Sequence, residues 1–304
     1  MARTGKHRTD VYEQVTNQII NCIEAGAGDW QMPWHKSGSG LNRPTNIDTN
    51  NDYRGINVVS LWACAHVRGF GTGTWGTYRQ WQNKGCQVRK GEKSSLVIFY
   101  KEFKVEDTDT QSDETAFETR RVARASYVFN ADQVDGYETP ELPEQTDPVV
   151  TLAAAEQFIT ETGAKIQHGG ERAFYQPGGD FIQMPDEARF QGTATSTATE
   201  SYYGTLLHEL THWTGVKRRC DREFGKRFGD DAYAMEELVA ELGAAFLCAD
   251  LGITLEPRAD HAAYIDHWLK VLKADKKAIF TAASQAAKAS DFLTGLQSKI
   301  QEAA

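Results

Sequence analysis

Residues 206–213 read Leu-Leu-His-Glu-Leu-Thr-His-Trp, so two histidines lie four positions apart inside an apolar run. On a helix, His208 and His212 share one face about one turn apart, and both imidazoles can reach a single metal ion. Glu209 is rotated to the side of that face, where its carboxylate can meet a water molecule bound to the ion. The pattern therefore predicts a helix with two metal ligands and a general base, as in zinc hydrolases.

A catalytic site of this kind needs a third protein ligand and leaves a fourth position to water. A second apolar run downstream places Glu237 and Glu241 four positions apart. We predict that His208, His212 and Glu237 bind the metal. Glu241, one turn further on, is expected to accept the N–H of a ligand histidine. The spacing alone leaves Glu236 and Glu241 as alternative ligands. We expect one divalent ion per chain, with zinc as the first choice and manganese as the alternative.

Two other interpretations fit the motif. A His-Glu-x-x-His pattern can arise by chance on a solvent-exposed amphipathic helix. The surroundings favour a specific site, because Thr197 and Glu200 have the spacing of a capping box at a helix start, and Gly215 follows the last periodic residue. A metal that only stabilises the fold is the second alternative.

Charge is distributed unevenly along the chain, whose net charge is −9. Residues 1–104 hold 14 Lys and Arg against 8 Asp and Glu, whereas the remainder holds 19 against 34. A basic segment in an acidic protein indicates a localised site for a polyanion, because the charge of the whole protein would otherwise repel phosphate groups.

Hydrophobic periodicity indicates helices and strands in both halves, which predicts an α+β protein. Helical spacing is found in residues 9–25, 58–67 and 151–162 and in the two metal-bearing runs, and strand patterns in 96–100, 123–129, 164–166, 173–175 and 181–184. The acidic residues 105–119 are expected to form a hairpin tip. Three prolines among acids in residues 137–148 indicate a boundary, so we predict an N-terminal domain over 1–137, a linker over 138–149 and a C-terminal domain over 150–304. The order helix, small sheet, metal helix, metal helix is that of a minimal zincin domain.

Several features limit location and cofactors. No stretch is apolar and long enough to span a membrane, and the first residues are polar and basic, so we expect a cytoplasmic protein. The five cysteines are widely spaced and form no C-x-x-C pair, which is typical of reduced thiols. Residues 71–76 match G-x-G-x-x-G, but no strand before them or acid after them completes a dinucleotide site, and we interpret them as a loop. No nucleotide cofactor is expected.

Aromatic side chains recur every third residue in the basic segment, at Trp75, Tyr78 and Trp81. Single-stranded nucleic acid binds to such mixtures because each base stacks on a ring for about 1–3 kcal/mol while cations contact the phosphates. The same spacing is also typical of a helix face packed into a core. The candidate contacts to single-stranded DNA are Arg54, Trp75, Tyr78, Trp81, Arg89, Lys90 and Lys93.

Longer motifs lie in both halves: residues 33–34 (Pro-Trp), 53–57 (Tyr-Arg-Gly-Ile-Asn), 75–81 (Trp-Gly-Thr-Tyr-Arg-Gln-Trp), 88–93, 128–130, 207–215, 227–230 and 233–241. On these motifs the chain resembles the ArdC family of plasmid antirestriction proteins over nearly its whole length. The resemblance implies an N-terminal single-stranded DNA-binding domain, a C-terminal zincin-like metallopeptidase domain and protection of DNA that enters by conjugation. It also implies that Glu237, as the first acid of an E-x-x-x-[acid or amide] pair, ligates the metal.

In the mechanism that we expect, Glu209 takes the proton of an attacking water and returns it to the leaving amine of a protein substrate, with host restriction components as candidate substrates. A donor to the developing negative charge is also needed, and the candidates are Tyr202, Tyr203, His261 and Tyr264. The strand pattern at 181–184 could present an edge to a substrate chain. Two other functions compete: a non-enzymatic DNA shield with a structural metal, and a peptidase that removes proteins crosslinked to DNA. The family's link to conjugation also allows delivery of the protein into the recipient cell.

Overall fold

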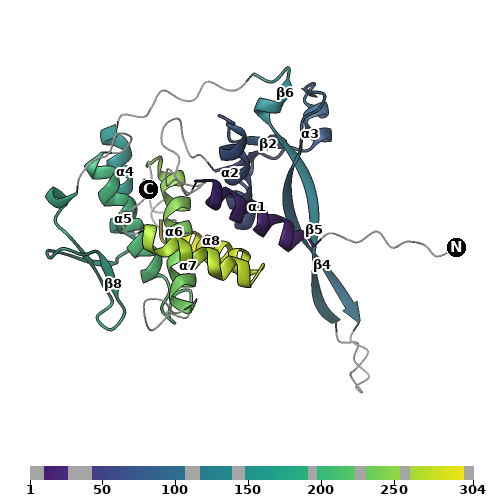
Figure 1. Ribbon diagram of the computed structural model, residues 1–304. Coiled ribbons are helices and arrows are strands. Elements are labelled where there is room, and N and C mark those ends of the chain that lie inside the picture. Colours follow the sequence, from purple (N-terminus) through teal and green to yellow (C-terminus); the bar gives the residue numbers. More distant parts are fainter. Residues whose placement is uncertain are drawn as a thin grey trace.

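The computed structural model describes residues 10–26, 43–106, 117–138, 148–190, 197–222, 231–253 and 261–297, and it has the mixed α+β architecture that the sequence predicts (Figure 1). The N-terminal half contains α1 (Val11–Gly26), β1 (Thr45–Asn46), α2 (Ile56–Arg68), β2 (Thr74–Gly76), α3 (Tyr78–Asn83), β3 (Gln87–Val88), β4 (Ser95–Glu106), β5 (Phe117–Asn130), the 3-10 turn η1 (Ala131–Gln133) and β6 (Val134–Asp135). The C-terminal half contains α4 (Pro148–Glu161), β7 (Lys165–His168), β8 (Phe174–Gln176), β9 (Phe181–Met184), the 3-10 turn η2 (Glu187–Arg189), α5 (Ala198–Trp213), α6 (Asp231–Leu251), α7 (His261–Ala274) and α8 (Ala278–Gln297).

A four-stranded sheet in the order β1-β2-β5-β4 forms the frame of the N-terminal half. Its largest part is the antiparallel pair β4–β5, which runs in register from Ser95 opposite Val128 to Glu106 opposite Phe117. This pair extends away from the helices in Figure 1. The predicted hairpin is therefore present, with longer strands than expected, and the middle of its predicted tip lies outside the described residues.

Helix α2 closes the outer edge of β4. The Asn57 side chain donates to the carbonyl of Ile98 at 2.8 Å and accepts from the Ile98 amide at 2.7 Å. Gly55 precedes this helix with a φ of 54°, a conformation that glycine adopts without strain. An edge strand exposes unpaired backbone groups, and here a side chain from a helix satisfies them. The motif at residues 53–57 thus attaches the start of α2 to strand β4.

The glycine-rich residues 71–76 are only partly a loop, which corrects the sequence interpretation. Residues Thr74–Gly76 form β2, which pairs in parallel with β1 and antiparallel with β5. A Cβ on Gly76 would lie 2.4 Å from Ile47 Cγ2 and 3.1 Å from Trp81 Nε1. This glycine therefore permits a close approach inside the protein, which is a packing role.

The C-terminal half places a three-stranded sheet, in the order β7-β9-β8, against α5. Strand β9 pairs in parallel with β7 on one side and antiparallel with β8 on the other. The expectation that residues 181–184 present a free edge is therefore wrong, because β9 is the central strand. Helices α6 and α8 pack against α5, and α7 packs against α6 and α8, which completes this half (Figure 1).

One hydrophobic core joins the two halves. It contains buried side chains from α1 and α2 together with buried side chains from α5, α6 and α8. The rings of Trp62 and Phe246 lie 5.8 Å apart, and Arg43 makes two hydrogen bonds to Asp250 at 2.5 and 2.8 Å. In Figure 1, α1 and α2 lie between the β4–β5 hairpin and helices α5 and α6. Most of the predicted linker lies outside the described residues, and the predicted domain limits stay a prediction.

The described cysteines Cys64, Cys86, Cys220 and Cys248 are all free thiols. Among the described helices, none has the length and apolar character needed to cross a membrane.

Candidate metal centre

Both histidines lie on α5, a helix with a well-defined N-terminus. Its start is the predicted capping box, in which the Thr197 hydroxyl accepts from the Glu200 amide and the Glu200 side chain accepts from the Thr197 amide. The helix then passes through the core, so that His208 and Glu209 are each only 3% exposed. Histidine and glutamate are rarely buried to this extent without a specific partner, which indicates a functional pair.

The three predicted ligands come together in the structure. His208 Nε2 lies 3.2 Å from His212 Nε2 and 3.5 Å from Glu237 Oε2, and His212 Nε2 lies 3.6 Å from Glu237 Oε1. In a tetrahedral site with bonds of about 2.0–2.1 Å, ligand atoms are about 3.3 Å apart. The group His208, His212 and Glu237 is therefore sized for one divalent ion.

The other nitrogen of each ring lies near a carboxylate. His212 Nδ1 lies 3.1 Å from Glu236 Oε1, and His208 Nδ1 lies 3.6 Å from Glu241 Oε2. A carboxylate beside Nδ1 favours the tautomer with its proton there, and the lone pair is then on Nε2. Two such lone pairs 3.2 Å apart repel each other unless a cation lies between them. The donor set thus fits a bound metal ion.

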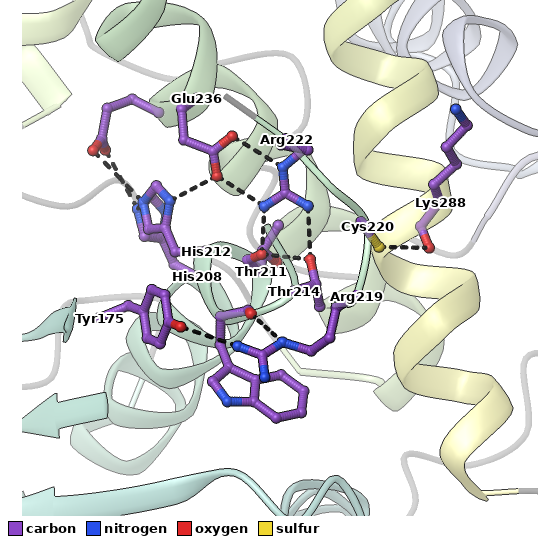
Figure 2. Close-up of polar contacts among 12 residues, drawn as sticks. Tyr175, His208, Thr211, His212, Thr214, Arg219, Cys220, Arg222, Glu236 and Lys288 are labelled. Carbon is purple, nitrogen blue, oxygen red and sulfur yellow. Dashed lines mark hydrogen bonds and ion pairs between the residues drawn. The ribbon is translucent and has the colours of Figure 1, made fainter. Parts of the chain in front are cut away.

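Glu236 is a site residue that the sequence analysis considered only as a ligand. Its carboxylate is 5% exposed and accepts two hydrogen bonds from Arg222, at 2.9 and 2.8 Å, besides facing His212 (Figure 2). Burial by itself would raise the pKa of Glu236, but the hydrogen bonds from His212 and Arg222 outweigh it and hold the pKa below its ordinary value. Glu236 is therefore a charged acceptor. Three acids within six residues were the only signal of this role.

Comparison with known proteins agrees with this geometry. Residues 9–129 match the family described as the N-terminal domain of anti-restriction factor ArdC, and residues 153–285 match the zincin-like metallopeptidases. The metal-free crystal structure of antirestriction ArdC from plasmid R388 is 41% identical, covers 94% of this chain and 97% of that one, and has a TM-score of 0.74. This chain belongs to the ArdC family of antirestriction proteins.

Other relatives of this ArdC-family protein extend the comparison. The Mn(II)-bound structure of R388 ArdC is 39% identical over 96% of this chain and all of that one, with a TM-score of 0.73. Protein y4eC of Sinorhizobium fredii is 47% identical over 98% of this chain and 96% of its own length. The DNA primase TraC of Escherichia coli is 38% identical over 96% of this chain, which corresponds to 28% of that protein.

Of the four residues expected to donate to the developing negative charge, the structure describes the side chains of Tyr202 and Tyr203. The Tyr202 hydroxyl lies 2.8 Å from His168 Nε2, and burial, followed by the nearby charge of Glu187, raises the pKa of Tyr202 to about 12. Tyr203 is also buried, at 8% exposure. The side chains of His261 and Tyr264 lie outside the described residues. Burial also raises the pKa of Tyr203, so both tyrosine hydroxyls stay protonated at neutral pH.

Two of the predicted DNA contacts of this ArdC-family chain are wrong as stacking platforms. Trp75 is 1% exposed and packs in the main core, and Trp81 is 0% exposed in a small core with Cys86 and Val88. A base cannot stack on a ring that has no free face. The predicted row is also broken by the fold, since Trp75 lies on β2 and only Tyr78 and Trp81 lie on α3.

The remaining predicted contacts are exposed, but not all are free. Tyr78 is 43% exposed and, with Arg89 and Lys90, lines an open hollow of about 700 Å³ between α3, β3 and β5. Arg89 also donates to the backbone carbonyl of Asp132. Arg54 instead pairs with Asp291 on α8, at the contact between the two halves. Lys93 is exposed beside the hollow's Glu92. DNA binding by these residues stays a prediction.

Proposed function

We propose that this protein binds single-stranded DNA, protects plasmid DNA that enters by conjugation from restriction, and hydrolyses protein at that DNA with a divalent metal. The observation that carries the catalytic part is the convergence of two histidine Nε2 atoms, 3.2 Å apart, on Glu237, with a carboxylate behind each ring. Zinc is the proposed ion, because two imidazoles and one carboxylate with an open fourth position suit it. Manganese is the alternative, supported by the Mn(II)-bound R388 relative.

In this proposal, Glu209, Glu236 and Glu241 have separate roles in peptide hydrolysis. A divalent ion at this site would acidify an attacking water and polarise the peptide carbonyl. Glu209, next to His208 on α5, accepts the proton of that water and returns it to the leaving amine. Glu236 and Glu241 keep the two imidazoles in the tautomer whose Nε2 lone pair faces Glu237. The buried surroundings of Glu209 exclude bulk water and strengthen these interactions.

The proposed DNA surface is the hollow beside α3. Tyr78 and Phe129 make an edge-to-face contact there, and Tyr127, two residues earlier on the same face of β5, is 56% exposed. Arg89 and Lys90 line the same hollow. Aromatic faces for bases beside cations for phosphates are what a single strand requires. The buried Trp81 supports this surface from below, since its Nε1 donates to the Phe129 carbonyl at 3.1 Å.

Glu209→Gln tests the catalytic part in the living cell. We expect this variant to bind metal as the wild type does and to lose protection, measured as the efficiency of plasmid transfer into recipients with and without a restriction enzyme. A drop confined to restricting recipients supports the proposal. Full protection by Glu209→Gln contradicts it and favours a non-enzymatic DNA shield. Proteolysis of a labelled casein probe, with and without a single-stranded oligonucleotide, measures the chemistry directly.

The DNA part is tested with the full chain by fluorescence anisotropy of a labelled single strand at two salt concentrations. Tyr78→Ala should weaken binding by about 1–3 kcal/mol, and Lys90→Ala should reduce both affinity and salt dependence. Phe174→Ala is the matched control, because Phe174 is also 43% exposed but lies on β8 of the other half. Equal losses in Tyr78→Ala and Phe174→Ala would contradict the proposed surface.

A further inference from the structure

We infer that Arg222 is a positioning residue of the metal centre: it holds Glu236 against His212 and keeps the Glu236 carboxylate out of the ligand set. The inference rests on the proposed metal centre and adds to it a residue that contacts neither metal nor substrate. Arg222 lies in the segment after α5, fourteen residues before Glu236, and no sequence motif singles it out.

The contact between Arg222 and Glu236 uses both carboxylate oxygens. Arg222 Nε donates to Glu236 Oε2 at 2.9 Å, and Nη2 donates to Oε1 at 2.8 Å. The side chains are 3% and 5% exposed. A planar guanidinium matches a carboxylate in this two-point geometry, which fixes direction as well as charge. The same Oε1 lies 3.1 Å from His212 Nδ1, so the contact with Arg222 sets the position of the oxygen that orients the His212 ring.

Arg222 is itself anchored to the helix that carries the histidines. Its Nη1 donates to Thr214 Oγ1 at 2.7 Å, and its Nη2 donates to the Thr211 carbonyl at 2.6 Å. The Thr211 carbonyl lies in the last turn of α5, where it also accepts from the Thr214 amide at 3.1 Å and from the Thr214 hydroxyl at 2.6 Å. Figure 2 shows Arg222 between the end of α5 and Glu236 of α6. One side chain thereby ties the two metal-bearing helices together beside the centre.

The two-point contact with Arg222 also distinguishes Glu236 from its neighbour Glu237, which has a different role. Glu236 and Glu237 are neighbours on α6, and either carboxylate could bind a divalent ion. Both oxygens of Glu236 are engaged by Arg222, whereas Glu237 faces the Nε2 atoms of the histidines. Arg222 also supplies a positive charge beside the acids of the centre. The arrangement leaves Glu237 as the ligand and Glu236 as the acceptor behind His212.

The test measures metal affinity of the full chain by competition with a chromogenic chelator, for the wild type, Arg222→Met, Glu236→Gln and the double variant. Arg222→Met should weaken affinity about 10- to 100-fold, as loss of an orienting partner does. In the Glu236→Gln background the same change should have no further effect, because Arg222 acts through Glu236. Arg219→Met is the matched control: Arg219 is also buried, at 6% exposure, but contacts Asp180 and Trp213 instead, so metal affinity should stay at the wild-type value.

Visible absorption of the Co²⁺-loaded chain gives a second readout that a purely structural role would not move. Release of Glu236 in Arg222→Met should let the His212 ring turn and weaken the absorption that is typical of a tetrahedral centre. If Arg222→Met does not fold, Arg222→Lys replaces it in the cycle, since an ammonium cannot hold both oxygens. Wild-type affinity in the Arg222 variant, or an equal loss in the Glu236→Gln background, would overturn the inference. His208→Ala separately tests the centre itself: a wild-type chain with no more affinity than His208→Ala would contradict the proposed function instead.

Discussion

Gly243 of α6 lies directly against Thr211 of α5, at the level of the metal centre. An added Cβ at Gly243 would be 2.5 Å from Thr211 Cγ2 and 2.7 Å from its Oγ1. Thr211 has no room to move, because it is fully buried and its hydroxyl donates to the Leu207 carbonyl at 2.9 Å. The absence of a side chain at Gly243 therefore lets the two helices approach closely enough for Glu237 to reach both histidines.

Gly243→Ala should weaken both stability and metal binding. Overpacking costs about 1–3 kcal/mol, and the better helix propensity of Ala offsets about 1 kcal/mol of that. Urea unfolding and metal titration measure the two effects. Gly295→Ala is the matched control on α8, where nothing lies within 4 Å of the added Cβ, and it should be neutral or stabilising. Wild-type metal affinity in Gly243→Ala would show that the close approach does not set the site.

Asn57→Ala should destabilise the fold by leaving the Ile98 amide and carbonyl without their partners. Each unpaired buried group costs about 1–3 kcal/mol, and Asn57 is 9% exposed. Urea unfolding gives the change in free energy. Asn51→Ala, at an exposed position before α2, is the control and should change little. A loss below about 1 kcal/mol in Asn57→Ala would mean that the edge of β4 is satisfied in another way.

Protonation of Asp180 in acid should lower the free energy of unfolding. The hydrogen bond from Arg219 holds the pKa of Asp180 below its ordinary value, in spite of partial burial. A carboxyl with a lowered folded pKa contributes stability that is present above its unfolded pKa, about 3.9, and is lost as pH falls through the folded value. Asp180→Asn should therefore be less stable than the wild type near neutral pH.

The measurement for Asp180 is the free energy of unfolding of both proteins, without metal, across this pH range. The difference between wild type and Asp180→Asn should stay constant near neutrality and shrink below about pH 4. Asn also adopts the left-handed φ of 49° found at this position, so the backbone should not add strain. A difference that grows on acidification would contradict the assignment.

Heat should unfold the two halves together. Because α1 and α2 share one core with α6 and α8, calorimetry of the full chain should give one transition. A divalent ion at about 100 times its Kd should stabilise the whole protein by about 2.7 kcal/mol, although it binds only in the C-terminal half. Glu237→Gln should abolish most of this gain. Two transitions, of which the metal moves only one, would show that the halves unfold independently.

The sequence by itself determined the elements whose signals are local. The spacing of His208 and His212, the cap at Thr197 and the apolar run around Glu237 depend on helical periodicity, which operates within a few residues. These signals placed the two metal-bearing helices and limited the third ligand to Glu236, Glu237 or Glu241, and the structure brings Glu237 together with both histidines. The β4–β5 hairpin was predictable for the same reason.

Only the tertiary structure decided which side chains face solvent and which partners meet across the chain. Trp75 and Trp81 have the spacing of a binding surface, but their burial depends on β5 and η1, more than forty residues away. The central position of β9 depends on the order of three strands, which no local pattern encodes. Arg222 meets Glu236 only because the segment after α5 folds back against α6. Contacts of this kind are set by packing of the whole core, whereas helical periodicity is set by neighbours along the chain.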